Sequence, residues 1–280
     1  MALPTLTPSA SYLSLSNLIS TRSLEPCRKL LILDLNGTLL YRSKYTKNRI
    51  IRARPYMATF CSYLFHENVR SWLDVMVWSS AQPRNVDIMV QTCFKESKKE
   101  LKAVWARDTL GLDKRSYNHK VQTIKDLETP WKKLSCPVSH SANTTILMDD
   151  SPLKTQLQPY NHLCVREYTQ NVMNSDRLAR KRLRPSYDCM LLAAIGILEE
   201  LKYQTNVAGW IRAGGLWADC SPPSNEITLE PSMDPEATSS GNASSQELLW
   251  FDHEPCYNYW VEKGMVTVKQ LGINLNPGFS

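Results

Sequence analysis

A carboxylate, a glycine and a hydroxyl follow an apolar run in a pattern suited to phosphoryl transfer. The run spans residues 29–33, and Asp34, Gly37 and Thr38 come directly after it. An open α/β sheet presents functional side chains where its parallel strands end, so Asp34 is expected at a strand tip. Gly37 permits a tight turn, and Thr38 offers a hydroxyl and a backbone N–H to an anion. Such a carboxylate can attack phosphorus and form an acyl-phosphate. The alternative is a buried strand followed by an ordinary Asn-Gly turn.

Three later stretches could supply the other groups that this reaction needs, namely a hydroxyl donor, a cation and a metal-binding carboxylate. The apolar runs 73–78 and 144–148 end in Ser-Ser-Ala and in Asp-Asp-Ser-Pro, and Lys125 lies in an apolar stretch between them. Each piece is a weak signal alone, but their order and roughly even spacing are unlikely to arise by chance. We therefore expect each group to stand at the end of its own strand, around one site.

Taken together, these stretches resemble the haloacid dehalogenase (HAD) superfamily, and within it the small carboxy-terminal-domain phosphatases, also called NLI-interacting-factor-like. The resemblance covers roughly residues 28–200. It implies an α/β fold with a three-layer, Rossmann-like parallel sheet, a small β-hairpin flap and no large cap domain. The matching segments are 34–38, 53–55 ahead of a helix with Phe60, 78–81, 125–127 and 148–152.

The resemblance implies a role for individual residues. Asp34 matches the nucleophile, and Ser79 matches the hydroxyl of the second motif, where the family more often has Thr. Lys125 matches the lysine of the third motif, and Asp149 matches the metal-binding acid of the fourth. The residues expected to bind the phosphate are Thr38, Ser79, Ser80 and Lys125.

Mg²⁺ is the cofactor that the ligands favour. Carboxylate oxygens of Asp34 and Asp149, with a carbonyl and waters, suit this hard cation better than a soft metal. The expected metal site also includes Asp150, and the resemblance implies that Asn36 contributes its backbone carbonyl. The bound ion would neutralise part of the phosphate charge. The alternative for 149–151 is a helix N-cap with acids that favour the helix dipole, and both interpretations can hold.

Asn36 departs from the family pattern, which has a second Asp two residues after the nucleophile. That Asp protonates the leaving oxygen and later activates water, and an amide can do neither. General acid–base help is worth about 10²- to 10⁴-fold in rate, so its loss predicts a slow enzyme. Three outcomes stay open: a degenerate site, substitution by a neighbour such as Asp150, or a leaving group that needs no proton.

The spacing of the motifs also bears on the substrate. Asp34 and Ser79 are 45 residues apart, Ser79 and Lys125 are 46 apart, and Lys125 and Asp149 are 24 apart. Each interval is too short to hold a lid domain as well as scaffold. Small molecules are usually enclosed, so an open site favours a phosphorylated protein segment as substrate or ligand. The basic segment 40–54 is expected to form the hairpin flap, which either attracts acidic segments or is simply solvated.

Composition predicts a soluble intracellular protein. The chain has 280 residues, 42% of them apolar, and its net charge of +6 is too small to indicate direct binding of nucleic acid. Its eight cysteines are scattered, as in reduced proteins, and no apolar stretch is long enough to predict a membrane span. Segment 177–184 is either a nuclear import signal or a solvated helix face. Nucleus or cytoplasm is favoured over mitochondrion, because residues 1–24 contain a single arginine.

The chain is expected to divide into four parts: a disordered start (1–26), the HAD-like domain (27–215), an acidic disordered linker (216–247) and an aromatic segment (248–280) that docks on the domain or on a partner. Of these two, docking on the domain is favoured. Within the domain, the pattern predicts helices over 55–66, 83–94 and 185–203, and additional strands within 103–107 and 163–166.

Three functions are consistent with the sequence. The first is a Mg²⁺-dependent phosphoprotein (Ser/Thr) phosphatase, a phosphoric monoester hydrolase that acts through an aspartyl-phosphate and is impaired by Asn36. The second is a catalytically degenerate module that binds phosphate or phosphopeptides. The third is a component of the mitochondrial presequence translocase, which ranks last because that family member is membrane-anchored.

Overall fold

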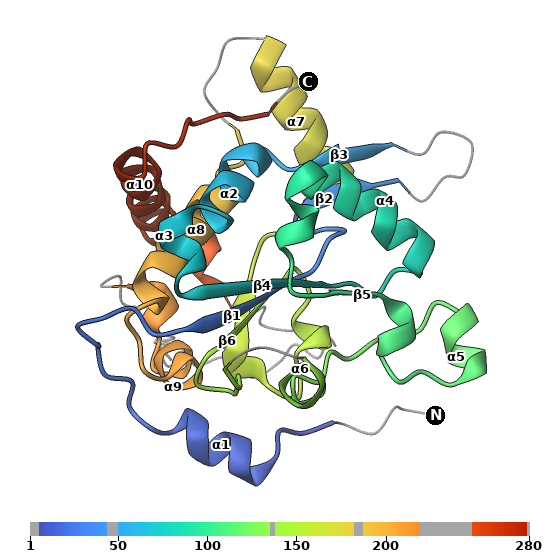
Figure 1. The fold of residues 1–280 in the computed structure, drawn as a ribbon. Helices are drawn as coiled ribbons and strands as arrows, with labels where there is room; N and C mark the ends of the chain where they lie inside the picture. The colour runs from blue at the N-terminus through green and yellow to red at the C-terminus, as the bar shows by residue number, and fades with distance from the viewer. Residues whose placement is uncertain (1–5, 44–49, 135–137, 182–186, 219–247, 279–280) are drawn as a thin grey trace, which may run out of the picture.

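A five-stranded parallel sheet in the order β5-β4-β1-β6-β7 forms the centre of the protein (Figure 1). The computed structural model describes residues 6–43, 50–134, 138–181, 187–218 and 248–278. Because β1, β4 and β6 are buried on both faces, their sequences are mostly apolar rather than alternating, with Lys29, Asp74 and Thr145 as buried polar exceptions. The strands are β1 (Lys29–Leu33), β4 (Leu73–Trp78), β5 (Val104–Trp105), β6 (Thr145–Asp149) and β7 (His162–Cys164).

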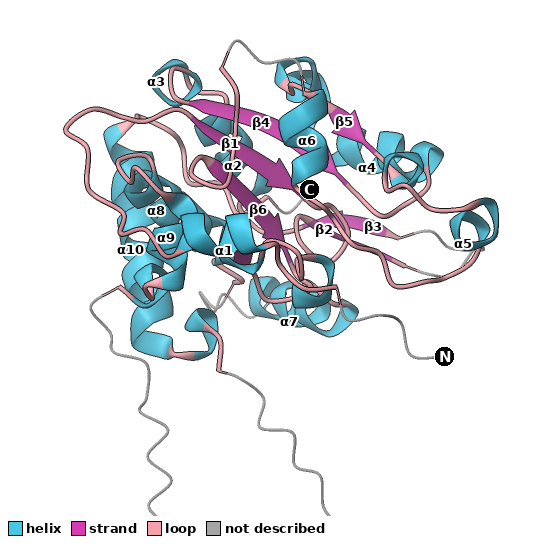
Figure 2. Ribbon diagram, turned by 90° about the horizontal axis from the view of Figure 1, so that it is seen from below, coloured by secondary structure: helices cyan, strands magenta, loops and turns pink. Residues whose placement is uncertain are grey.

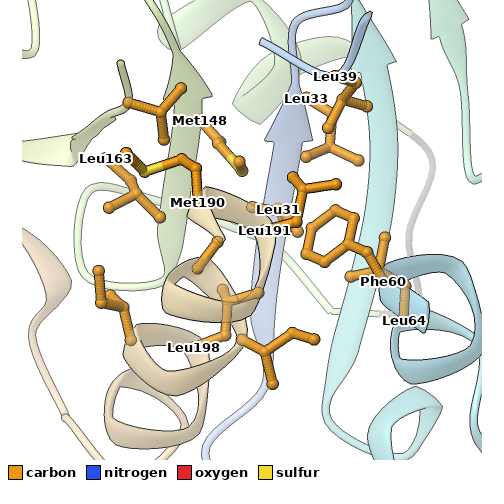
Figure 3. Packing of buried hydrophobic residues seen from close by; sticks show 14 of the residues in the cluster. Leu31, Leu33, Leu39, Phe60, Leu64, Met148, Leu163, Met190, Leu191 and Leu198 are labelled. Atoms are coloured by element: carbon orange, nitrogen blue, oxygen red, sulfur yellow. The ribbon is translucent and has the colours of Figure 1, made fainter. Parts of the chain in front are cut away.

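Alternate residues of β1 face two different helical layers. Leu31 and Leu33 belong to the larger core cluster, with Phe60 from α2 and Leu191 from α8 (Figure 3). Leu30 and Ile32 belong to a second cluster on the opposite face, which α6 covers. In Figure 2, α6 crosses in front of the strands and α2 lies behind them. The predicted three-layer α/β fold is therefore confirmed. The helices named here are α2 (Met57–Leu64), α6 (Glu128–Lys133) and α8 (Met190–Leu201).

A small antiparallel hairpin stands beside the sheet. It consists of β2 (Leu40–Arg42) and β3 (Ile51–Ala53), with Leu40 opposite Ala53. The two strands of the expected flap are confirmed, and its tip at 44–49 lies outside the described residues. In the described chain between β1 and β4, the hairpin is joined only by α2 and by α3 (Glu67–Arg70), so this insertion holds no cap domain.

The amino-terminal segment is partly ordered, contrary to the expected disorder of 1–26. Helix α1 (Ala10–Ser16) packs on α9 (Val207–Arg212). Tyr12 is buried, and its hydroxyl accepts a hydrogen bond from Tyr160 N at 2.9 Å. The Asn206 side chain donates to the carbonyls of Leu15 and Leu18. A polar segment is thus held mainly by one aromatic anchor and by hydrogen bonds to its backbone.

The carboxy-terminal helix α10 (Glu254–Gln270) lies against α8 at very short range. A Cβ added to Gly264 would lie 1.9 Å from the carbonyl oxygen of Leu192, and one added to Gly196 would lie 2.2 Å from that of Trp260. The buried indole of Trp250 donates to Cys164 O at 2.8 Å. Segment 248–278 therefore packs on the domain, whereas the expected linker lies outside the described residues beyond residue 218.

The remaining helices and 3-10 turns complete the described part of the chain. Predicted helix 83–94 coincides with α4, and the helix predicted over 185–203 begins at Met190 within the described chain. None of the helices described is long and apolar enough to cross a membrane. These elements are α4 (Pro83–Phe94), α5 (Lys114–Asn118) and α7 (Gln170–Lys181), with 3-10 turns η1 (Lys95–Glu100), η2 (Arg107–Thr109), η3 (Pro152–Lys154), η4 (Pro159–Asn161), η5 (Gly215–Trp217) and η6 (Trp250–Asp252).

Candidate active site

The candidate site lies at the carboxyl ends of β1 and β6, where the strand order reverses. From β1 the chain adds β4 and β5 on one side and then β6 and β7 on the other. Parallel sheets bind ligands at such a switch point, because the connections leave it in opposite directions. Asp34 follows β1 and its N–H donates to Met148 O at 3.0 Å, while Asp149 ends β6. The two carboxylates are therefore brought together by strand pairing.

Gly37 allows the loop after Asp34 to turn against the end of β6. Its φ of +94° lies in the left-handed region, and an added Cβ would come within 2.7 Å of an Asp150 carboxylate oxygen. The next residue completes the contact: Thr38 Oγ1 donates to Asp150 Oδ1 at 3.0 Å and accepts from Asp150 N at 3.1 Å. Thr38 thus fixes Asp150.

Asp34, Asp149 and Asp150 form one acidic cluster. Each offers a carboxylate oxygen, and these oxygens lie within 4.8 Å of one another. Asp34 and Asp149 are buried at 2% and 0% exposure, so their charges need compensation from nearby groups. The structure supplies it with two lysines.

Lys125 is the first of these lysines. Its buried Nζ lies 3.0 Å from Asp34 Oδ1 and 2.6 Å from Asp149 Oδ2, so the predicted convergence of these three residues is confirmed. Its expected place at a strand end is wrong, since residues 121–126 form a loop ahead of α6. The backbone N–H of Lys125 donates to Lys154 O at 2.8 Å, which attaches this loop to η3 instead of the sheet.

Lys154 is the second lysine, and sequence reasoning missed it. Its Nζ lies 3.0 Å from Asp34 Oδ2, 2.8 Å from Asp149 Oδ1 and 3.6 Å from Asp150 Oδ1. The only signal in the sequence is its place four residues after Asp150, within the turn that follows the acidic pair. That spacing brings two side chains together only if the segment is helical, and η3 supplies the single turn required.

The two lysines set the ionisation of the acids. Burial by itself would raise the pKa of Asp149, but Lys125 and Lys154 hold that pKa well below its usual range. Burial raises the pKa of Asp150 to about 6, with Lys154 opposing the shift and Asp34 and Asp149 adding to it. Burial also disfavours the charged form of Lys154, but the three carboxylates raise its pKa above the ordinary value. At neutral pH Asp149 and Lys154 are therefore charged partners.

Ser79 and Ser80 follow β4, as predicted. Ser79 is buried, and its N–H donates to Trp105 O at 3.0 Å. The Ser80 hydroxyl shares a 2.8 Å hydrogen bond with Thr123 Oγ1, two residues ahead of Lys125. Ser80 thus contacts the lysine loop, and its predicted binding of phosphate stays a prediction, as does that of Ser79.

Asn36 lies near the acids in sequence, but its side chain contacts the hairpin. Its Oδ1 accepts a hydrogen bond from Arg42 N in β2 at 2.9 Å, and the residue is exposed. The amide therefore connects the loop after Asp34 to the last residue of β2. Its backbone role in metal binding stays a prediction.

Comparison with known families identifies the chain. Residues 29–206 match the sequence profile of the NLI interacting factor-like phosphatases, and this range contains every site residue described above. The chain belongs to the NLI interacting factor-like phosphatase family.

Relatives of this NLI interacting factor-like protein occur in yeast and plants. An uncharacterized FCP1 homology domain-containing protein of Schizosaccharomyces pombe is 37% identical over 218 residues, which cover 73% of this chain and 83% of that protein. A ubiquitin-like domain-containing CTD phosphatase of Arabidopsis thaliana is 25% identical over 155 residues, covering 54% of this chain and 44% of that protein. The solved structure of Fcp1, an essential RNA polymerase II CTD phosphatase, is a weak match at 13% identity and a TM-score of 0.39, over 87% of this chain and 64% of that one.

The NLI interacting factor-like domain of this chain has donors that fit a hard divalent cation. All three clustered groups are carboxylates, as such cations prefer. Asp34 Oδ1 is buried and, despite its ion pair with Lys125, has no hydrogen-bond partner among the described residues. The residues that could hold the ion are Asp34, Asp149 and Asp150.

Arg54 supports the loop after Asp34 in this domain. It is buried, and its Nη1 donates to Thr38 O at 2.8 Å, while its Nη2 forms a 2.8 Å ion pair with Asp188. The sequence places Arg54 in a matching segment but gives no sign of this partner, which lies 134 residues away. Arg54 therefore joins the loop to the start of α8.

Proposed function

We propose that this chain is a Mg²⁺-dependent phosphoprotein (Ser/Thr) phosphatase that forms an aspartyl-phosphate on Asp34 and turns over slowly. The observation that carries the proposal is the convergence of Asp34, Lys125 and Asp149 at the switch point of the sheet. A carboxylate, an ammonium and a second acid at one strand edge are the groups that phosphoryl transfer requires. Membership of a phosphatase family supports the same reaction.

In the first half of the reaction, a carboxylate oxygen of Asp34 attacks phosphorus as the bond to the substrate oxygen breaks. Lys125 would stabilise the charge on the phosphoryl oxygens, and the Ser79 hydroxyl would donate a hydrogen bond to them, whereas the Thr38 hydroxyl already donates to Asp150 Oδ1. A bound Mg²⁺, held by Asp34, Asp149 and Asp150, would neutralise part of the negative charge and reduce repulsion between carboxylate and phosphate. Water then attacks the aspartyl-phosphate, which releases phosphate and restores Asp34.

The proton transfers limit this enzyme. The leaving oxygen needs a proton in the first half, and the attacking water must lose one in the second. Asn36 can serve neither step, and its amide is already bound to Arg42 N. Both protons must then be exchanged with solvent, which costs the enzyme the acceleration that general acid–base catalysis gives.

A phosphorylated protein segment is the substrate class that we favour. The insertion after β1 contains a hairpin and two short helices in its described part, so the site is not covered by a domain. The hairpin segment is rich in Lys and Arg, which attract acidic and phosphorylated chains. The plant relative is named a CTD phosphatase, in agreement with a phosphate carried on a protein.

A phosphate-binding module without turnover is the second candidate. Asn36 favours it, because the residue lacks the proton chemistry and its side chain instead contacts the flap. The same cluster of charged side chains would then bind a phosphorylated segment and release it unchanged.

Turnover of a phosphopeptide by wild type, Asn36→Asp and Asp34→Asn decides between the two. Asp can accept the same hydrogen bond from Arg42 N, so Asn36→Asp is expected to fold normally and to raise kcat by about 10²-fold or more. Asp34→Asn should abolish turnover. Asn68→Asp, an exposed position in α3, adds the same charge away from the site and should change nothing.

Each remaining outcome has a definite meaning. Turnover by Asn36→Asp alone would support the module. Absence of turnover in all variants, together with unchanged metal binding in Asp34→Asn, would show that the assignment of the site is wrong.

A further inference from the structure

Lys154 occupies the middle of the acidic cluster. Its Nζ lies 3.0 Å from Asp34 Oδ2, 2.8 Å from Asp149 Oδ1 and 3.6 Å from Asp150 Oδ1. One ammonium therefore contacts all three carboxylates that could hold a divalent ion. Lys125 contacts the opposite oxygens, Asp34 Oδ1 and Asp149 Oδ2. The two lysines thus lie on different sides of the same acids.

An ammonium and Mg²⁺ cannot share this position. Mg²⁺ binds oxygen at about 2.0–2.1 Å and requires near-octahedral geometry, which leaves no room for a lysine amine among the same ligands. The two cations would also repel each other strongly at such a distance, because the site excludes most solvent. Lys154 must therefore leave these oxygens before the ion can use them.

The exposure of its side chain and its place in a short turn indicate that Lys154, rather than Lys125, is the lysine that moves. Its side chain is 15% exposed and has a route to solvent, whereas the Lys125 side chain is 0% exposed. Lys154 is the last residue of η3, a turn of three residues. Charge favours the exchange as well: with both lysines the three ionised acids keep one net negative charge, and replacing one ammonium by a divalent ion makes the set neutral.

We propose that Lys154 is a tethered counter-ion that holds the three carboxylates together in the metal-free protein and competes with Mg²⁺ for them. The inference rests on the proposed function only in its use of the metal site. It adds a regulatory property, since the apparent affinity for Mg²⁺ is reduced by the fraction of molecules in which Lys154 occupies the position. It also explains how three adjacent acids remain compatible with a stable fold without metal.

Calorimetric titration of full-length wild type, Lys154→Met and Lys102→Met with MgCl₂ tests the proposal, with no need for phosphatase activity. Methionine retains the length of the side chain and removes the competitor, so Lys154→Met should bind Mg²⁺ about tenfold more tightly or better. Lys102 is the matched control, because it forms a 3.3 Å ion pair with the buried Asp74 away from the site. Its removal should leave the Kd unchanged.

Thermal unfolding with EDTA and with Mg²⁺ gives a second readout. Lys154→Met should have a lower Tm than wild type in EDTA, because the acids lose a counter-ion, and a larger rise of Tm on adding Mg²⁺. If the variant is unfolded in EDTA, Mg²⁺ should restore its folding, and failure to do so would contradict the proposal.

Other results are equally decisive. Equal or weaker Mg²⁺ binding by Lys154→Met would overturn the competition, because the lysine would then be neutral or helpful to the ion. Absence of Mg²⁺ binding in all three proteins would contradict the metal site itself, and with it this inference. Tighter binding by Lys154→Met without phosphatase activity in any protein would contradict the proposed catalysis alone.

Discussion

Two lysines contact two buried aspartates at the carboxyl edge of the sheet, and burying these charges carries a desolvation cost. Lys125 and Lys154 each contact both Asp34 and Asp149. Buried ion pairs seldom stabilise a fold more than apolar packing would, because desolvation offsets the Coulombic gain. Packing alone therefore does not explain these charges, and the proposed phosphoryl transfer does.

A third buried lysine lies outside the site and has no such explanation. Lys29 begins β1 at 0% exposure, and its Nζ has no hydrogen-bond partner among the described residues. Burial lowers its pKa from the ordinary 10.5 to about 8, with a smaller opposing effect from Cys27. In the folded state this lysine is thus harder to protonate than in the unfolded chain.

Lys29→Met should therefore stabilise the protein in a pH-dependent way. Between pH 8 and 10.5 the unfolded wild type binds more protons than the folded one, so wild-type stability rises with pH there. The gain in free energy of unfolding from Lys29→Met should be about 1–3 kcal/mol at pH 7 and should shrink as pH approaches 10.

Urea unfolding at pH 7 and at pH 10 measures this gain. Lys99→Met, at an exposed position, is the control. An equal gain at both pH values would contradict the burial argument.

At the scale of elements, the strand ends define the site and the loops complete it. The strands β1, β4 and β6 could be predicted, because each is a mostly apolar run, interrupted in β4 by Asp74, that ends in a polar group. The place of Lys125 in a loop and the contribution of Lys154 could not, because both depend on a hydrogen bond between a loop and η3. Such contacts leave no periodic pattern in the sequence.

The two terminal elements also differ in how well the sequence predicts them. The aromatic segment after residue 248 gives a visible signal, since its tryptophans need burial and a hydrogen-bond acceptor. Helix α1 gives almost none, because Tyr12 is its main buried anchor within a segment rich in Ser, Thr and Leu. The expectation of disorder at the amino terminus was wrong for this reason.

The packing of α10 on α8 leads to a prediction about Gly264. An added Cβ would lie 1.9 Å from the Leu192 carbonyl oxygen, so Gly264→Ala must push the two helices apart. Alanine favours a helix by about 1 kcal/mol over glycine, yet we expect a net loss of about 1–3 kcal/mol from overpacking.

Chemical unfolding measures this effect, with Val266→Ala at a 54% exposed position of the same helix as control. Unchanged or greater stability of Gly264→Ala would show that the helices are not in close contact.

At the scale of the whole molecule, distant parts of the chain converge on one edge of the sheet. Asp34, Lys125 and Asp149 come from a strand tip, a loop and another strand, and Arg54 joins the loop after Asp34 to the start of α8. The carboxy-terminal segment covers α8 on its other side. The site is therefore a property of the complete domain, and its chemistry should depend on the folded chain.

Trapping with beryllofluoride tests the central claim most directly. Beryllofluoride mimics a phosphoryl group on an aspartate, so ¹⁹F NMR of the full chain with BeF₃⁻ and Mg²⁺ reports the acyl-phosphate geometry without turnover. The account predicts protein-bound fluorine signals that require Mg²⁺ and vanish in Asp34→Asn. Bound signals that persist in Asp34→Asn, or their complete absence in wild type, would contradict it.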